Sequence, residues 1–120
     1  MESTKILEDF HTRRNSGNKK ISSKQFLPFN RFIALDSRAY GEGEIPEKYK
    51  ELMGLVGSMV LRCNDCIYYH IDSAFKAGCS EKEILEAMNI ALVIGGSVVI
   101  PVLRAGLTAL DEIISVDNGV

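Results

Sequence analysis

Two cysteines and one histidine in the middle of the chain have the types and the spacing that thiol–disulfide chemistry requires. Two residues separate Cys63 from Cys66, and His70 follows Cys66 by four positions. On a continuous helix, side chains at positions i, i+3 and i+7 project from one face. The thiolate is the reactive form of cysteine, and a neighbouring imidazole can accept the thiol proton near neutral pH. The pattern favours a small redox enzyme.

The Asn64-Asp65 pair inside this motif can also interrupt the helix. Both residue types are preferred N-caps because their side chains accept hydrogen bonds from free backbone N–H groups. A break there places Cys63 at or just before a helix N-terminus, where the helix dipole stabilises a thiolate. On these grounds Cys63 is the more activated thiol. Cys79 has no comparable neighbours in the sequence and is interpreted as a packing residue.

Two other interpretations of the same residues remain open. A structural zinc site normally takes four ligands from two separated clusters, and Cys63, Cys66 and His70 have no second paired spacing to complete them. All three side chains could instead be buried in a helical core, in a non-catalytic helical assembly module. The redox hypothesis itself requires neither a metal nor an organic cofactor.

Composition limits the class of protein. A chain of 120 residues with 46% hydrophobic and 25% charged residues is typical of one globular domain. A net charge of −2 gives no reason to expect nucleic acid as a partner. The most apolar stretch, Ile90–Leu103, is shorter than the roughly 20 residues of a membrane-spanning helix. The charged start and the odd number of cysteines favour the reducing cytoplasm.

Hydrophobic periodicity predicts an all-α, single-domain bundle of five or six helices. Ser80 and Glu83 form a capping box, and Gly78 suits a helix end. The predicted helices run from Ser3 to about Arg14, from Pro28 to Tyr40, from Pro46 into the cysteine motif, from there to Ala77, from Ser80 to Gly95, and from Pro101 to about Ser115.

The segment Asn15–Lys20 is predicted to break the first helix. Residues 1–25 would then be an N-terminal helix and linker that packs on a neighbouring subunit, and residues 26–120 the helical domain. Inward-facing side chains are predicted at Ile6, Leu7 and Phe10 in the first helix, and at Phe29, Phe32 and Ile33 in the second.

Apolar surface around Leu52–Val60 and Ile90–Leu103 exceeds what so short a chain can bury against itself. We therefore expect an oligomer, in which a charge placed at Val99 disrupts assembly.

A longer pattern carries a family resemblance. Glu51 lies twelve residues before Cys63, the cysteine motif ends at His70, and Ala74–Ile84 is followed later by Gly95-Gly96. Over about residues 43–109 the chain resembles the alkyl hydroperoxidase D / carboxymuconolactone decarboxylase family. The resemblance implies an all-helical fold assembled as a homotrimer or homohexamer, and reduction of a peroxide or disulfide substrate by the cysteine pair.

The resemblance also implies roles for individual residues. Cys66 would attack the peroxide, Cys63 would close the disulfide, and Glu51 with His70 would form the proton relay. An external thiol reductant, in one branch a lipoylated protein, would restore the dithiol, with Cys63 as the exposed partner. The decarboxylase branch lacks the cysteine pair, so the alternative is a cofactor-free lyase that uses His70 and Glu51 as acid and base.

Two features of this chain bear on that assignment. Asp65 stands where the best-known members have a histidine, and a carboxylate there opposes formation of a thiolate at Cys66. Glu51 lies about 18 Å along a helix from Cys63, so the chain must fold back after Arg62 to bring Glu51 to the site.

Overall fold

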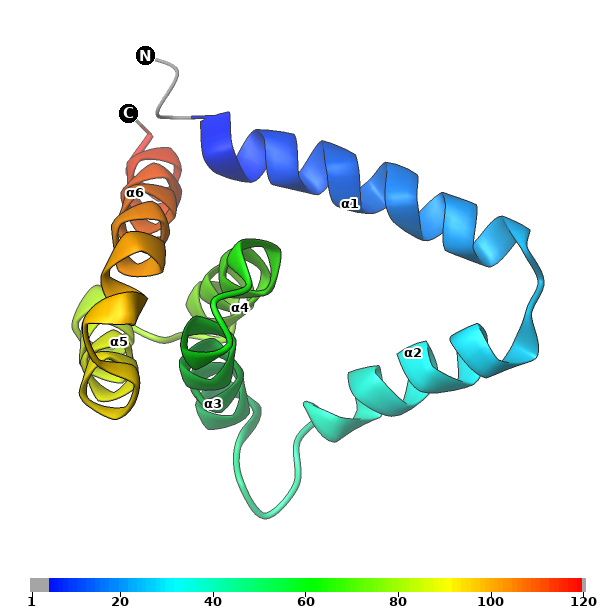
Figure 1. Ribbon diagram of the computed structural model, residues 1–120, viewed down its shortest axis with the longest axis horizontal. Coiled ribbons are helices and arrows are strands. Elements are labelled where there is room, and N and C mark those ends of the chain that lie inside the picture. Colours follow the sequence, from blue (N-terminus) through cyan, green and yellow to red (C-terminus); the bar gives the residue numbers. More distant parts are fainter. Residues whose placement is uncertain (1–4, 120) are drawn as a thin grey trace.

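The computed structural model describes residues 5–119, which form six α-helices and one short 3-10 helix (Figure 1). The predicted all-α fold is confirmed. The elements are α1 (Ile6–Ser23), α2 (Leu27–Ala39), α3 (Glu47–Val60), α4 (Asn64–Lys76), α5 (Glu81–Gly95), η2 (Gly96–Val99) and α6 (Ile100–Asp117).

Helices α3 to α6 form the core. Each contributes aliphatic side chains that are less than 2% exposed, and burying one such side chain stabilises the fold by about 1.5–3 kcal/mol. The largest are Leu55, Met59, Ile67, Ile71, Ile84, Met88, Val99 and Leu110. Val99 belongs to this core of its own chain, so the prediction that a charge there acts at a subunit interface is wrong. Its neighbour Val98 is 54% exposed.

Helix α3 ends in a Schellman motif. Arg62 adopts a left-handed conformation with φ of 61°, its N–H donates to the Met59 carbonyl at 3.0 Å, and the Cys63 N–H donates to the Ser58 carbonyl at 3.0 Å. This conformation costs a non-glycine residue about 1–2 kcal/mol. The turn reverses the chain, so α4 packs against α3, and the expected fold-back after Arg62 is confirmed.

Helix α4 ends in the same motif with a glycine in the left-handed position. Gly78 has φ of 103°, and the Cys79 N–H donates to the Ala74 carbonyl at 3.0 Å. The predicted capping box follows at once, because Ser80 Oγ accepts from the Glu83 N–H and the Glu83 carboxylate accepts from the Ser80 N–H. Local signals therefore set both ends of this connection.

The predicted break in the first helix is wrong. Helix α1 continues through Asn15–Lys20 and ends at Ser23; the predicted start at Ser3 lies outside the described residues. Gly17 costs an exposed helix about 1 kcal/mol, and asparagine less than that. The good helix formers on either side, Arg13-Arg14 and Lys19-Lys20, offset this cost.

The first turns of α1 pack on α4 and α6 of the same chain. Leu7 and Phe10 are buried as predicted, and the Phe10 ring meets the Tyr68 ring edge-on with centroids 5.8 Å apart. These contacts fix where the following turns of α1 run.

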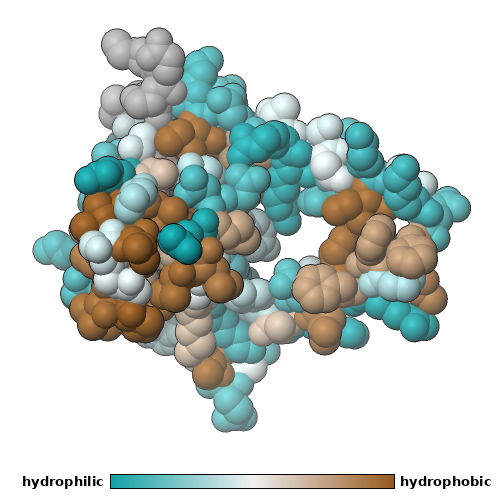
Figure 2. Space-filling model, in the orientation of Figure 1, coloured by the Kyte–Doolittle hydropathy of each residue, from teal (hydrophilic) through white to brown (hydrophobic). Residues whose placement is uncertain are grey.

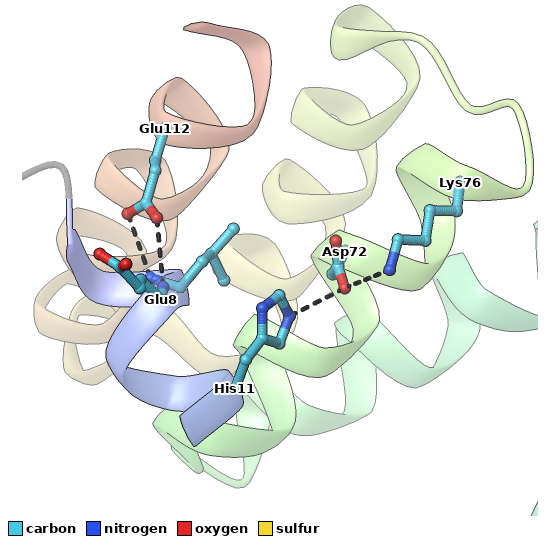
Figure 3. Close-up of polar contacts among 6 residues, drawn as sticks. Glu8, His11, Asp72, Lys76 and Glu112 are labelled. Atoms are coloured by element: carbon cyan, nitrogen blue, oxygen red, sulfur yellow. Dashed lines mark hydrogen bonds and ion pairs between the residues drawn. The ribbon is translucent and has the colours of Figure 1, made fainter. Parts of the chain in front are cut away.

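Polar contacts hold the same end of α1 (Figure 3). The buried Glu112 carboxylate of α6 accepts from the Leu7 N–H at 3.1 Å and from the Glu8 N–H at 3.3 Å. It satisfies first-turn N–H groups, because Lys5 at the N-cap makes no side-chain hydrogen bond. One turn later, His11 Nε2 lies 3.1 Å from the Asp72 carboxylate of α4.

Helix α2 forms where predicted, but its apolar side chains do not face inward. Phe29, Phe32 and Ile33 are 47%, 67% and 45% exposed, which corrects that prediction. We call residues 15–40, the second half of α1 together with α2 and its C-cap residue Tyr40, the arm. The arm stands away from the bundle, with open space between them and apolar side chains on its surface (Figure 2).

The segment Glu81–Asp117 contains an 18-residue window with a mean hydropathy of 2.1, enough by length and composition for a membrane-spanning helix, and 22% of that window is buried in the fold. It is not one straight helix, because η2 and the left-handed Gly96 interrupt it. The core helix of a soluble protein passes the same test of length and composition.

Candidate active site

Cys63 and Cys66 are joined by a disulfide at the N-terminus of α4, with their Cα atoms 5.3 Å apart. Cys63 is the N-cap residue itself: its backbone is extended, and its Sγ accepts the Cys66 N–H at 3.2 Å. The predicted position of Cys63 at a helix N-terminus is confirmed, but Cys63 itself is the N-cap and Asn64 and Asp65 lie in the first turn of α4, so the cap predicted at the Asn64-Asp65 pair is wrong. Both sulfurs therefore lie where free N–H groups and the helix dipole favour negative charge.

The two cysteines differ in exposure. Cys66 is exposed, whereas Cys63 is half-buried between the end of α3 and the start of α4. The expectation that Cys63 is the exposed partner is thus wrong for the single chain. The Schellman turn explains this, because it draws the Cys63 backbone in against Ser58.

His70 and Glu51 form a buried pair between α4 and α3. His70 Nδ1 lies 2.9 Å from Glu51 Oε1, and the two residues are 7% and 3% exposed. The fold brings together two residues that are 19 positions apart, as the proton-relay hypothesis requires. A carboxylate can only accept, so Nδ1 carries the hydrogen and Nε2 is left with a lone pair in the neutral ring.

Gly54, which the sequence analysis does not single out, makes this pairing possible. A Cβ at this position would lie 2.5 Å from His70 Cε1 and 2.7 Å from each ring nitrogen. The imidazole therefore packs flat against the α3 backbone. The sequence contains one indication of this role, because Gly54 follows Glu51 by three residues and therefore lies on the same helix face.

A cavity of about 440 Å³ opens beside the exposed sulfur, which is room for a small organic hydroperoxide. It combines aromatic rings with both signs of charge. Its lining residues are Phe10, Arg13, Arg14, Asp36, Asp65, Cys66, Tyr69 and His70. Four of them come from α1 and α2, so the arm and the start of α1 form one wall of the site. A larger hollow beside α6 and the end of α4 has neither Cys63 nor Cys66 in its lining.

Asp65 has a cationic partner that the sequence does not reveal. Arg13 of α1 donates to its carboxylate at 2.6 Å, which partly offsets the unfavourable effect of this carboxylate on a Cys66 thiolate. Both side chains are more than half exposed, so solvent screening weakens the pair. The next residue, Arg14, lies over the Tyr69 ring, 4.6 Å from its centroid.

Cys79 is the third thiol and lies apart from the pair. It is buried, as the packing interpretation predicts, and its Sγ lies 3.6 Å from the Lys48 carbonyl. Burial raises the pKa of this thiol, and the Glu83 and Glu51 carboxylates raise it further, against a lowering by Lys48. Cys79 is therefore an unreactive thiol near neutral pH.

Within residues 5–119, no three His, Cys, Asp or Glu side chains are grouped closely enough to hold a metal ion. The geometry thus offers no support for the zinc alternative.

Comparisons with known proteins agree with this fold. The family model described as the carboxymuconolactone decarboxylase family matches residues 28–112. Among curated proteins, an uncharacterised protein of the cox locus of Paracoccus denitrificans is 27% identical over 82 residues, which is 68% of this chain and 74% of its own.

Solved structures extend the comparison. A crystal structure from Thermotoga maritima is 45% identical, has a TM-score of 0.91, and aligns over 94% of this chain and 99% of its own. A second Thermotoga maritima structure, 47% identical with a TM-score of 0.86, aligns over 92% and 95%. A more distant protein from Legionella pneumophila, 22% identical with a TM-score of 0.77 over 90% and 94% of the two chains, shares the fold. This chain belongs to the carboxymuconolactone decarboxylase family.

Proposed function

We propose that this protein is a cytoplasmic thiol-dependent peroxidase. The observation that carries the proposal is the arrangement of one cavity: an exposed cysteine, already paired in a disulfide at a helix N-terminus, lines it together with a histidine held by a buried glutamate. A role in the antioxidative response has been suggested for the second Thermotoga maritima relative, and this supports the peroxidase proposal.

In the proposed reaction, the Cys66 thiolate attacks the terminal oxygen of a hydroperoxide. The S–O bond forms as the O–O bond breaks, which gives a sulfenic acid and an alkoxide. His70, which has taken the thiol proton, gives it to the alkoxide, and an alcohol leaves. The Cys63 thiol then displaces water from the sulfenic acid and closes the disulfide.

The two electrons that reduce the peroxide come from the cysteine pair and must be replaced. An external dithiol, such as the dihydrolipoyl group of a lipoylated protein, reduces the disulfide and becomes a disulfide itself. Cys66 is the more exposed residue of the pair, which favours it as the one that this reductant reaches first.

Thiol titration tests the peroxidase proposal. The reduced protein is treated with one equivalent of tert-butyl hydroperoxide, denatured, and its free thiols are counted. We expect two of the three thiols to disappear, and Cys79 to remain. Cys79→Ser is the matched control, and it should lose both of its thiols. Retention of all three thiols in the wild type would rule the peroxidase out.

The lyase alternative makes the opposite prediction for the cysteines. The buried His70–Glu51 pair is an acid and a base in position for proton transfer without them. The double variant Cys63→Ser/Cys66→Ser separates the two functions. A lyase retains turnover of a carboxylated ring substrate in this variant, whereas a peroxidase loses all reaction with peroxide.

We also propose that the chain assembles as a homotrimer or homohexamer. A 13-residue helix is marginal in isolation, yet every residue of α2 keeps part of its surface exposed. A second apolar face lies on α5 and η2, where Ile90, Val93, Ile94 and Val98 are more than half exposed. Copies of the chain that bury these faces would stabilise the arm.

Light scattering coupled to size exclusion measures the assembly. We expect a mass of three or six chains for the wild type and a smaller species for Phe32→Asp. Asn30→Asp is the matched control, because it places the same side chain on α2 at an exposed polar position. A wild-type species with the mass of one chain would contradict the assembly.

A further inference from the structure

Tyr40, at the end of the arm, contacts the buried pair of the site. It is the C-cap residue of α2 and is half-buried. Its hydroxyl oxygen lies 3.4 Å from His70 Nε2, and the two ring centroids are 5.0 Å apart. The contact joins the arm to the catalytic histidine of the proposed function, on which this inference rests.

The two contacts of the imidazole complement each other chemically. Glu51 accepts from Nδ1, so Nε2 is the acceptor in the neutral ring, and the Tyr40 O–H is a donor. Burial raises the pKa of the Tyr40 phenol, and the charges of Asp36 and Glu51 and the neighbouring Tyr69 raise it further. The phenol thus keeps its hydrogen at physiological pH, and one tautomer of His70 satisfies both neighbours.

Lys50 fixes the backbone on both sides of Tyr40. Its ammonium group donates to the Ala39 carbonyl at 3.1 Å and to the Gly41 carbonyl at 2.8 Å. A cation that caps the carbonyls at the end of α2 also complements the helix dipole. All residues of α2 are described by the structure, and none of them is buried. The two hydrogen bonds from Lys50 are therefore a specific restraint on the position of Tyr40.

We infer that Tyr40 is a positioning residue for His70: its hydroxyl holds the imidazole in the Nδ1–H tautomer against Glu51, and Lys50 holds Tyr40 in place. The lone pair on Nε2 is then already formed on the nitrogen that must accept the thiol proton. When the cysteines are reduced, the hydroxyl has to yield this lone pair to Cys66. A long hydrogen bond of 3.4 Å suits that exchange.

Nitrogen-15 NMR of His70 tests the inference on the oxidised protein without any measurement of activity. Imidazole nitrogens that carry a hydrogen and those that do not have well-separated shifts. We expect the wild type to show a single Nδ1–H tautomer. Tyr40→Phe should move the Nε2 signal, because its lone pair loses the hydroxyl donor, and Lys50→Met should move it in the same direction by a smaller amount. Tyr49→Phe removes a hydroxyl from an exposed tyrosine of α3 and should leave the spectrum unchanged.

The rate of peroxide-dependent thiol loss is the second readout. Tyr40→Phe should slow it by about fivefold to tenfold, the size of one net hydrogen bond. A mixture of tautomers in the wild type, or a spectrum unchanged by Tyr40→Phe, overturns the inference even if the peroxidase reaction is real. A wild type with one tautomer and no reaction with peroxide refutes the proposed function and leaves the positioning role standing.

Discussion

The bundle and the arm contain similar apolar sequences with opposite fates. In the bundle, Ile71 of α4 is fully buried, whereas Ile33 of α2 in the arm is 45% exposed. Both lie on helix faces where apolar side chains recur at the usual helical spacing of three or four residues. The difference teaches that an amphipathic pattern predicts an apolar helix face but does not predict whether the rest of the same chain covers that face. The site lies where the two regions meet, with His70 and Glu51 from the bundle and Tyr40 from the arm.

Matched truncations give the most direct test of this contrast. Ile71→Ala should lower the free energy of unfolding by about 2–5 kcal/mol, because it leaves a cavity in the core. Ile33→Ala should change it by no more than about 0.5 kcal/mol in dilute protein. Denaturant titration at several protein concentrations measures both. An Ile33→Ala loss as large as that of Ile71→Ala, at every concentration, would mean that the arm packs within its own chain.

The bundle side of the site depends on the close approach at Gly54. Gly54→Ala should slow peroxide-dependent thiol oxidation by about 100-fold, since its Cβ displaces the His70 ring by a distance that catalysis does not tolerate. Gly57→Ala on the same helix is the control, because nothing lies within 4 Å of its Cβ. That variant should keep the wild-type rate and gain about 0.5–1 kcal/mol of helix stability. Equal rates for the two variants would contradict the flat packing of His70.

The attachment of α1 to the bundle predicts a local effect. Glu112→Ala leaves the Leu7 and Glu8 N–H groups without their acceptor and should cost about 1–3 kcal/mol. Hydrogen exchange should become faster in the first turns of α1 and stay unchanged in α3. Glu8→Ala, at an exposed position, serves as the control and should have little effect. Faster exchange throughout α3 and α4 would show that α1 is part of the core rather than docked on it.

The smallest effect is a pH dependence within the bundle. The Ser80 N–H holds the pKa of Glu83 below its ordinary value of 4.5, with help from Lys48 and against a smaller effect of burial. The lowered pKa means that this contribution is present above pH 4.5 and is lost as the pH falls through the folded-state value. Unfolding of the wild type and of Glu83→Gln should therefore converge toward acid pH. Glu81→Gln should keep the wild-type pH dependence, and parallel curves for wild type and Glu83→Gln would contradict the assignment.

Local signals in the sequence were enough to place most helices of the bundle. The capping box at Ser80 and the glycine at position 78 each act on backbone groups within a few residues. Such signals hold in the folded chain because no distant partner is needed. The helix end at Arg62 lacked its usual glycine, because hydrogen bonds to the Met59 and Ser58 carbonyls outweigh a cost of about 1–2 kcal/mol. Helix α1 ran through a glycine and asparagines, because good helix formers on either side offset a cost of about 1 kcal/mol.

The residue types of the site were also fixed by sequence: two cysteines at redox spacing, a histidine one turn later, and a glutamate that the family pattern singles out. Only the tertiary structure decided which of these groups touch. The Schellman turn at Arg62 set α4 against α3 and made the Glu51–His70 hydrogen bond. Gly54, Tyr40 and Arg13 entered the site from other turns and helices, because side chains far apart in sequence meet only after the helices pack.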